Sequence, residues 1–387
     1  MATKPIYLDY AAATPIDTDV LMAMLPYFTD NFYNPSATYL KAKAVAKDIA
    51  AARAQVAQVI GCRPSEIIFT AGGTEANNLA IKGIMESHPG ANLIVSTIEH
   101  ESVLEPAKKF DCKLSPVDQA GTVDLDKLSQ LIDDQTVLIS IMYANNEIGT
   151  IEPLKKIAGI VKLKRLQRAA AGNSRPLYFH TDACQAPGYL DLHVGQLGVD
   201  LMTLNGGKIY GPKQSGALYI NRQVGLSPQI LGGGQESNLR SGTENVAAII
   251  GFSRALTLVQ ADRLEASSRI TNLRDSFINQ LSAKITSFQI NGSLTKRLPN
   301  NLSLTFPGYD NETLLMQLDE RGIECASGSA CNAQTNQTSH VLKAIGLVPE
   351  TAQSTLRLTL GKFTTSSDIE YTVDTLANLL NKLVCGQ

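Results

Sequence analysis

Two charged residues, Asp182 and Lys208, each follow an apolar run, where a charged side chain is unusual. Asp182 lies in PLYFHTDA (176–183), and Lys208 stands in NGGKIYGPK after the run DLMTLNG (200–206). A carboxylate that follows apolar residues is held in a dry place, which favours a cationic partner. The glycines beside Lys208 allow close backbone approach to a ligand, and they are equally typical of a tight turn.

An anion site is indicated at the turn that follows the strand-like run EIIFT (66–70). The sequence AGGT (71–74) opens a helix-like run, and the free N–H groups of a helix N-terminus attract anions. Gly73 would let the backbone approach the anion, and Thr74 would add a hydroxyl. The same four residues are also typical of a glycine turn with a threonine N-cap.

Pyridoxal phosphate is a cofactor that would use these groups together. It needs a lysine for its Schiff base, an acid against its pyridinium nitrogen, a phosphate cradle and a group that covers its ring. Lys208, Asp182, the 71–74 turn and His100 supply one of each at successive strand ends. Taken alone, a histidine such as His100 is more often structural than catalytic. The sequence contains neither GxGxxG nor a Walker lysine, which argues against nucleotide binding.

A cysteine and an arginine near the C-terminus are candidates for handling a substrate. Cys331 lies in CASGSACNAQTNQTS (325–339), a stretch almost without apolar anchors, so we expect an exposed, nucleophilic thiol. Arg357 lies between apolar residues in STLRLTLG (354–361) and needs an anion there. A substrate carboxylate and an internal ion pair would both satisfy it. Four other cysteines are expected to be structural: Cys62, Cys112, Cys184 and Cys385. Cys325 lies at the edge of the loop, and its role is ambiguous.

Strand-like and helix-like segments alternate through the first two thirds of the chain, and they must position these residues. The buried-strand patterns are EIIFT, NLIVST (92–97), TVLISIMYA (136–144), PLYFHTDA and DLMTLNG. This alternation predicts an α/β fold with a mostly parallel sheet covered on both faces by helices. Ligands bind at the carboxyl ends of the strands in such sheets. SGALYI (215–220) follows a Gly-Pro turn and could return antiparallel.

The pattern changes near residue 260, which predicts a second domain. A long polar helix, a strand pair around 286–306 and a closing strand and helix at 355–384 are typical of an α+β unit. We therefore expect a large cofactor-binding domain over 15–259. Residues 1–14 and 260–387 would form a smaller domain that carries the Cys331 loop.

Composition restricts the function classes. The 387 residues are 44% hydrophobic and 18% charged, which suits a sizeable core, and the net charge of −2 favours neither nucleic acid nor an anionic membrane. No apolar stretch approaches the roughly 20 residues that span a bilayer. MATKPIYLDY lacks the apolar region of a signal peptide, so we expect a cytoplasmic protein with reduced thiols. The six cysteines include no CxxC pair, which argues against a metal site.

Nine sequence runs together resemble the NifS/IscS-type cysteine desulfurases, in the class-V branch of the pyridoxal-phosphate aminotransferase superfamily. They occur in family order from about residue 6 to 380 and read YLDYAAATP, FTAGGTEANNLAIKG, IEHESVLEP, SIMYANNEIG, FHTDACQAPG, KIYGPKQSGALYI, GGGQESNLRSGTEN, SGSAC and LRLTLGKFTT. The resemblance implies the fold type I of pyridoxal-phosphate transferases, with a seven-stranded sheet in the large domain.

The resemblance also implies how the cofactor is held. Lys208 would carry it as a Schiff base and shuttle the proton of the substrate Cα. Asp182 would keep the pyridine nitrogen protonated, Gln185 would bond the phenolic oxygen, and His100 would stack on the ring and act in acid–base steps. Residues of the two glycine turns would hold the phosphate: Gly73, Thr74, Asn205 and Gly207. Thr243 from the other subunit of a homodimer would join them.

The implied substrate is L-cysteine, whose carboxylate Asn146 and Arg357 would bind, and Asn146 would also contact the cofactor. Cys331 thiolate would attack the substrate sulfur, form a persulfide and release alanine. The SGSAC form of the loop resembles the longer-loop subgroup, in which the loop carries the persulfide to a protein acceptor. That acceptor would serve iron–sulfur cluster assembly or a nucleic-acid thiolation or phosphorothioation pathway, without direct binding of nucleic acid.

Four features depart from the family pattern. Asn205-Gly206-Gly207 replaces Ser-Gly-His, so an imidazole donor to the phosphate is lost at Gly207, and Gln235-Glu236-Ser237 replaces His-Glu-Arg. The basic region 162–175 is longer than usual and is expected to form a solvated helix end and loop. The chain ends soon after its last helix, without the tail expected to dock a cluster scaffold.

Other functions remain open on the same scaffold. Selenocysteine lysis, cystine C–S lysis and transamination would use the same cofactor, although those that need no thiol nucleophile would leave Cys331 without a role. A degenerate sulfur-carrier or interaction protein is a second alternative. Gly207 supports it, whereas intact Lys208, Asp182 and Cys331 argue against it.

Overall fold

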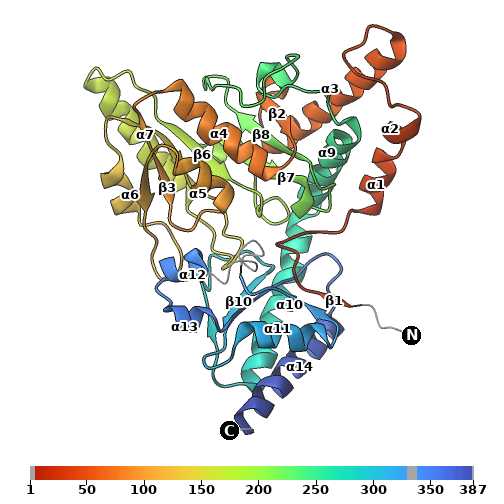
Figure 1. Cartoon of the computed structure of the whole chain (residues 1–387), viewed down its shortest axis with the longest axis vertical. Coiled ribbons are helices and arrows are strands. Elements are labelled where there is room, and N and C mark those ends of the chain that lie inside the picture. The colour runs from red at the N-terminus through yellow and green to blue at the C-terminus, as the bar shows by residue number, and fades with distance from the viewer. Residues whose placement is uncertain (1–4, 329–337, 386–387) are drawn as a thin grey trace.

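Figure 1 shows the computed structural model of the chain, which describes residues 5–328 and 338–385. The larger part is built on a seven-stranded sheet of order β2-β8-β7-β6-β5-β3-β4. Its strands are β2 (Ile67–Thr70), β3 (Asn92–Ser96), β4 (Asp111–Ser115), β5 (Thr136–Ser140), β6 (Tyr178–Asp182), β7 (Leu201–Asn205) and β8 (Gly216–Ile220). β8 runs antiparallel to both β2 and β7, and the remaining neighbours pair in parallel, as the sequence predicts.

Two strand predictions need correction. The run 136–144 does not form one strand, because β5 ends at Ser140 and residues 141–144 leave the sheet. Strand β4 was not predicted, because its sequence DCKLS is too polar to read as a buried strand. It occupies an edge of the sheet and pairs on one side, so it needs no continuous apolar run.

Helices cover both faces of this sheet because successive strand residues point to opposite sides. In β3, Leu93 and Val95 pack against Ile81 and Ile84 of α4, whereas Ile94 belongs to the core of the other face. The helices of the larger part are α1 (Thr18–Met24), α2 (Pro26–Thr29), α3 (Leu40–Ile60), α4 (Gly73–Ser87), α5 (Glu101–Ala107), α6 (Leu125–Leu131), α7 (Leu154–Ala170), α8 (Val194–Leu197) and α9 (Val246–Ala261).

The smaller part lies below the sheet in Figure 1 and is entered by the long helix α10 (Arg263–Lys284). Its antiparallel sheet has the order β12-β10-β9, and a second, parallel pair joins β1 to β11. One apolar core includes Leu8 of the N-terminal segment together with residues of α10, β10, β12 and α14. The elements are β1 (Ile6–Tyr7), β9 (Gln289–Ile290), β10 (Asn301–Thr305), α11 (Asn311–Asp319), β11 (Ile323–Glu324), α12 (His340–Ala344), α13 (Pro349–Ala352), β12 (Thr355–Thr359) and α14 (Ser366–Cys385).

The segment 162–175 is a largely solvated helix end and loop, as the sequence predicts, with one exception. It contains the end of α7, but Arg168 is buried there. Its guanidinium donates hydrogen bonds to the main-chain carbonyls of Thr136 and Pro176, so this arginine anchors the helix end to the sheet. Every helix within the described ranges falls short of the length and apolarity that crossing a bilayer requires.

Candidate active site

A pocket of about 180 Å³ lies at the carboxyl ends of the parallel strands, where the N-terminal segment and β12 approach the larger sheet. Nine predicted site residues line it: Gly73, Thr74, His100, Asn146, Asp182, Gln185, Asn205, Lys208 and Arg357. Residues far apart in the sequence therefore meet in one place. Met142 and Ala144, beyond the end of β5, also form part of its wall.

Asp182, the last residue of β6, is buried and both of its carboxylate oxygens accept hydrogen bonds. Oδ1 accepts the N–H of Cys184 at 2.9 Å, and Oδ2 accepts Nδ2 of Asn77 at 2.7 Å. These two donors fix the orientation of the carboxyl group. Asn77 was not among the predicted site residues, and its place in the ANN run of helix α4 carried no signal that distinguished it from a packing residue.

Lys208 closes a short 3₁₀ turn, Gly206–Lys208, that follows β7. Its Nζ donates to the carbonyl oxygen of Ala12 at 2.5 Å. Asn205 caps the turn, because its Oδ1 accepts the N–H of Gly207 at 3.0 Å. The turn thus holds the lysine amine beside the N-terminal segment and in the wall of the pocket.

The start of α4 forms a place for an anion. Gly72 has a φ of 130°, which favours glycine, and no side chain caps the helix. At Gly73 a Cβ would lie 2.6 Å from Sγ of Cys184, so a larger residue would displace the thiol. The uncapped helix N-terminus, with Thr74 in the pocket wall, leaves main-chain N–H groups that would suit an anion.

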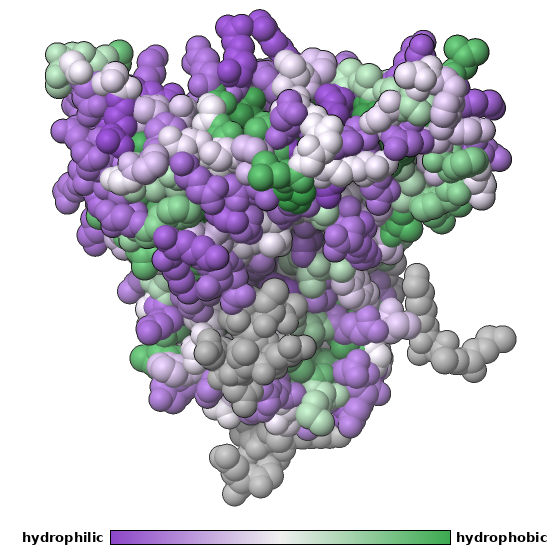
Figure 2. Space-filling view, turned by 45° about the horizontal axis from the view of Figure 1, so that its top comes forward, coloured by the Kyte–Doolittle hydropathy of each residue, from purple (hydrophilic) through white to green (hydrophobic). Residues whose placement is uncertain are grey.

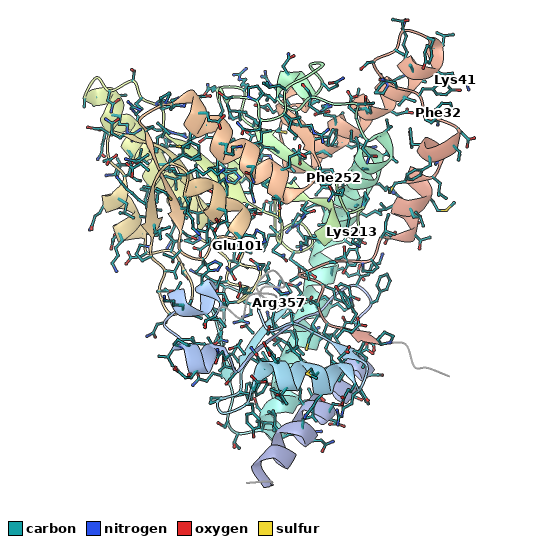
Figure 3. All side chains as sticks on the ribbon, viewed as in Figure 1. Phe32, Lys41, Glu101, Lys213, Phe252 and Arg357 are labelled. Carbon is teal, nitrogen blue, oxygen red and sulfur yellow. The ribbon has the colours of Figure 1, made fainter. Side chains whose placement is uncertain are left out.

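Arg357 of β12 lines the pocket from the smaller part, and Figure 3 shows it between the larger and the smaller part. It forms an ion pair with Asp9 at 2.7 Å, and a second guanidinium nitrogen donates to the carbonyl oxygen of Asn146 at 3.3 Å. Its Nε is buried and has no hydrogen-bond partner among the described residues. The internal ion pair therefore exists, and one donor remains for another anion.

The N-terminal segment contributes more to this site than the sequence indicated. Ala11 and Ala12 line the pocket, and their carbonyl oxygens accept hydrogen bonds from Gln185 and Lys208. Asp9 orients Arg357. In the sequence, an aspartate between two tyrosines in a short segment gives no signal that it meets an arginine near residue 357.

Three predicted residues are not in the pocket wall. Gly207 lies in the turn beside it, and Thr243 is exposed on the segment before α9. Cys331 lies outside the described residues. The chain on either side of that cysteine is anchored near the pocket, because Ala326 exchanges two main-chain hydrogen bonds with Arg357 and Ser339 donates to Glu147 at 2.6 Å.

The other thiols within the described ranges are unpaired and half-buried: Cys62, Cys112, Cys184 and Cys325. Burial raises the pKa of Cys112 to about 11 and those of Cys62 and Cys325 to about 12. Burial, with the nearby Asp182 carboxylate, also raises the pKa of Cys184, which lines the pocket. These thiols are therefore weak nucleophiles at neutral pH. No group of three or more metal-ligating side chains occurs in the part of the chain that is described.

The chain is similar to known proteins over nearly its whole length. The aminotransferase class-V family model matches residues 6–372. The cysteine desulfurase IscS of Dictyoglomus turgidum is 42% identical, over 98% of this chain and 95% of the relative. Among solved structures, a NifS-like protein has a TM-score of 0.89 at 34% identity, covering 97% of this chain and 99% of its own. SspA in complex with cysteine has a TM-score of 0.78 at 35% identity, covering 94% and 100%.

Proposed function

Because the chain belongs to the class-V aminotransferase family, we propose that it is a cysteine desulfurase that uses pyridoxal phosphate. It would convert L-cysteine to L-alanine and pass the sulfur through Cys331 to a protein acceptor. One observation carries the proposal: the pocket that gathers Lys208, Asp182 and Arg357 is also where the Cys331 segment is anchored. The resemblance inferred from the sequence motifs is confirmed by the relatives.

The residues of the pocket fit pyridoxal phosphate. Asp182, oriented by two hydrogen-bond donors, suits a pyridinium nitrogen, and the uncapped start of α4 suits a phosphate. Lys208 supplies the amine for covalent attachment. When bound, the cofactor would supply an electron sink for the carbanion at the substrate Cα. Gln185, which follows β6, and His100, which follows β3, complete the wall.

A cysteine carboxylate would be bound at the side of the pocket that Arg357 forms. The free Nε of Arg357 offers a charged donor in a buried place, where such a hydrogen bond is stronger than in water. Asp9 and the Asn146 carbonyl hold the guanidinium in position without using that donor. The substrate would thus be oriented before any bond is broken.

The sequence position of Cys331 would allow its thiol to reach this pocket. This cysteine stands five residues after Ala326 in the sequence, and the main chain of Ala326 is hydrogen-bonded to that of Arg357. An extended chain covers at most about 3.6 Å per residue, which allows a reach of roughly 18 Å from that anchor. The thiol would attack the substrate sulfur, whose bond to Cβ breaks, and the sulfur would remain on Cys331.

We also propose a homodimer in which Thr243 reaches the partner's phosphate site. Large apolar side chains are exposed along the segment 21–40, and Figure 2 shows hydrophobic side chains at the right-hand edge, the side where Figure 1 places α1 and α2. They are Leu21, Met22, Leu25, Phe28, Phe32, Tyr39 and Leu40. Such a surface on a single chain favours a partner. The division into domains 15–259 and 1–14 with 260–387, and the cytoplasmic location, belong to the same proposal.

The direct test replaces Cys331 with serine. Cys331→Ser should bind pyridoxal phosphate and still bind cysteine, because neither step uses the thiol. Alanine formation should fall to background, because a hydroxyl cannot take the sulfur. The measurements are alanine release and peptide mapping of protein-bound ³⁵S from labelled cysteine.

Cys62→Ser is the matched control, because that thiol is half-buried with a raised pKa and lies outside the pocket. It should retain wild-type turnover and labelling. Normal alanine production by Cys331→Ser, or label recovered on a peptide without residue 331, would overturn the desulfurase mechanism in favour of a lyase.

A further inference from the structure

A chain of hydrogen bonds connects Asp182 and His100, two polar residues that line the pocket. Asn77 donates one amide hydrogen to Oδ2 of Asp182 at 2.7 Å and the other to Oγ of Ser102 at 2.8 Å. Ser102 Oγ lies 2.8 Å from Nδ1 of His100, and the Ser102 backbone N–H lies 3.0 Å from the same nitrogen. All four residues line the pocket, and they come from β6, α4 and α5. His100 itself is the N-cap of α5.

The direction of each bond in this chain follows from the donor capacity of the groups. Both oxygens of Asp182 accept hydrogen bonds, so Asn77 turns its Nδ2 group toward this side chain. Because Nδ2 then also donates to Ser102, the hydroxyl hydrogen of Ser102 is free to donate onward to His100. The backbone N–H of Ser102 is a donor in any case. Two donors therefore converge on Nδ1 of His100, which must be an unprotonated acceptor.

The orientation of Asn77 has a cost that supports a specific purpose. Its Oδ1 is buried and has no hydrogen-bond partner among the described residues. A buried acceptor left unmatched is unfavourable, so a residue that served packing alone would be expected to avoid it. This orientation of the Asn77 amide keeps the two hydrogen bonds from Nδ2 to Asp182 and Ser102, at the expense of an unmatched Oδ1.

We propose that Asn77 and Ser102 are positioning residues that fix His100 as the Nε2–H tautomer. Nδ1, the basic nitrogen of the neutral ring, is occupied by two donors, so His100 presents a hydrogen-bond donor rather than a base to the pocket. The same amide of Asn77 orients Asp182, so one side chain sets both groups. The tautomer follows from the contacts of this chain alone. Its use in desulfuration rests on the proposed function.

The test observes the ring nitrogens directly. The protein is labelled with ¹⁵N-histidine, which places probes at five histidines, and His100 is assigned by the loss of its signals in His100→Gln. In the wild type, without and with pyridoxal phosphate, Nε2 should carry the proton and Nδ1 should resonate as an unprotonated acceptor. This measurement needs no variant at the proposed residues.

Ser102→Ala and Asn77→Ala then interrupt the chain at two different points. Each should move the His100 nitrogen signals toward a mixture of tautomers. Each should lower kcat for alanine formation on the order of ten-fold, because His100 is no longer held in one orientation. KM for cysteine should change little, because the residues proposed to bind the substrate carboxylate are not altered. Two independent variants guard against one that fails to fold.

Ser140→Ala is the matched control, because Ser140 Oγ lies 2.8 Å from Nδ1 of buried His180. It removes the same kind of contact elsewhere and should move the signals of His180 only. A wild-type His100 protonated on Nδ1, or unchanged His100 signals in folded Ser102→Ala, would overturn the inference. A wild type with the expected tautomer but no alanine formation would instead overturn the proposed function and leave the inference standing.

Discussion

Gly207 stands where the resembling family carries a histidine, and its surroundings show that a side chain would be tolerated there. A Cβ at this position would lie 3.6 Å or more from its neighbours, which is ordinary contact. Its φ lies outside the left-handed range, so the backbone does not require glycine. Asn205 already occupies the Gly207 N–H, so the lost imidazole has no replacement from that amide.

Gly207→His should therefore tighten binding of pyridoxal phosphate. One recovered charge-assisted hydrogen bond to phosphate is worth roughly 1.5–3 kcal/mol, or about 10- to 150-fold in Kd. Equilibrium titration of the apoprotein measures it, with Gly207→Ala as the control for side-chain volume. An unchanged or weaker affinity would mean that another group already supplies the bond.

Arg357 is the second residue whose contacts predict a measurable role. Arg357→Lys keeps a positive charge beside Asp9. It removes the planar guanidinium, and with it the buried Nε that has no partner among the described residues. KM for cysteine should rise roughly 10- to 100-fold, with a smaller change in kcat. Steady-state kinetics measures this, and Arg321→Lys, at an exposed arginine, is the control. An unchanged KM would leave the ion pair with Asp9 as the only role of Arg357.

At the scale of elements, buried glutamates form hydrogen bonds between helices, loops and strands that the strand pattern does not reveal. Glu236, in the run that departs from the family, binds Arg53 through both carboxylate oxygens and accepts the N–H of Phe69 in β2. It ties the loop before α9 to the sheet, in a backbone turn where Glu236, Ser237 and Asn238 all have positive φ. Glu152, just before α7, accepts the N–H of Val123 and is almost fully buried.

The free energy of unfolding should depend on pH through Glu152. Burial raises the pKa of Glu152 to about 8. Between its ordinary value, near 4.5, and 8, the unfolded chain releases a proton that the folded chain retains, so stability falls as pH rises. The loss is complete above pH 8 and amounts to roughly 5 kcal/mol at about 1.4 kcal/mol per pH unit.

Glu152→Gln should remove this dependence. Urea unfolding at pH 5 should find the variant close to the wild type, and at pH 8.5 it should be more stable by several kcal/mol. Glu105→Gln, at an exposed glutamate, should leave the pH profile unchanged. A glutamine variant that loses stability equally at both pH values would show that Glu152 titrates normally.

At the scale of the whole molecule, the homodimer proposed above would complete each active site with a residue of the partner subunit. Within one chain Thr243 is exposed and does not line the pocket that contains Lys208. If Thr243 serves the partner's site, each site combines Lys208 of one subunit with the threonine of the other.

Subunit complementation tests this arrangement. Lys208→Ala and Thr243→Ala homodimers should each have low desulfurase activity. Co-expressed with different affinity tags, they should form heterodimers in which one site has both native residues, so about half of the wild-type activity per dimer should return. A heterodimer carrying both substitutions on the same chain also keeps one intact Lys208 but should remain weak. Restoration in that second heterodimer instead of the first would place Thr243 in the site of its own chain.

The sequence by itself determined the α/β alternation, the antiparallel return of 215–220 and the candidates at strand ends, because these depend on local patterns. Apolar runs mark buried strands, and parallel strands bring their carboxyl ends to one edge. Asp182, Lys208 and His100 were predictable for that reason. The apolar surroundings of Arg357 marked it as an anion-binding candidate, and the family motifs added Gln185 to the site.

Only the tertiary structure decided the contacts between distant segments. Asp9 meets Arg357 across 348 positions, and Asn77 meets Asp182 across 105. Hydrophobic periodicity places a residue on a face of its own element, but it does not specify which polar atom of another element lies opposite. The same limit hid the edge strand β4, whose pairing with β3 comes from the sheet and not from its own polar sequence. Hydrogen bonds between side chains are set by packing at the scale of an ångström, which only the folded chain defines.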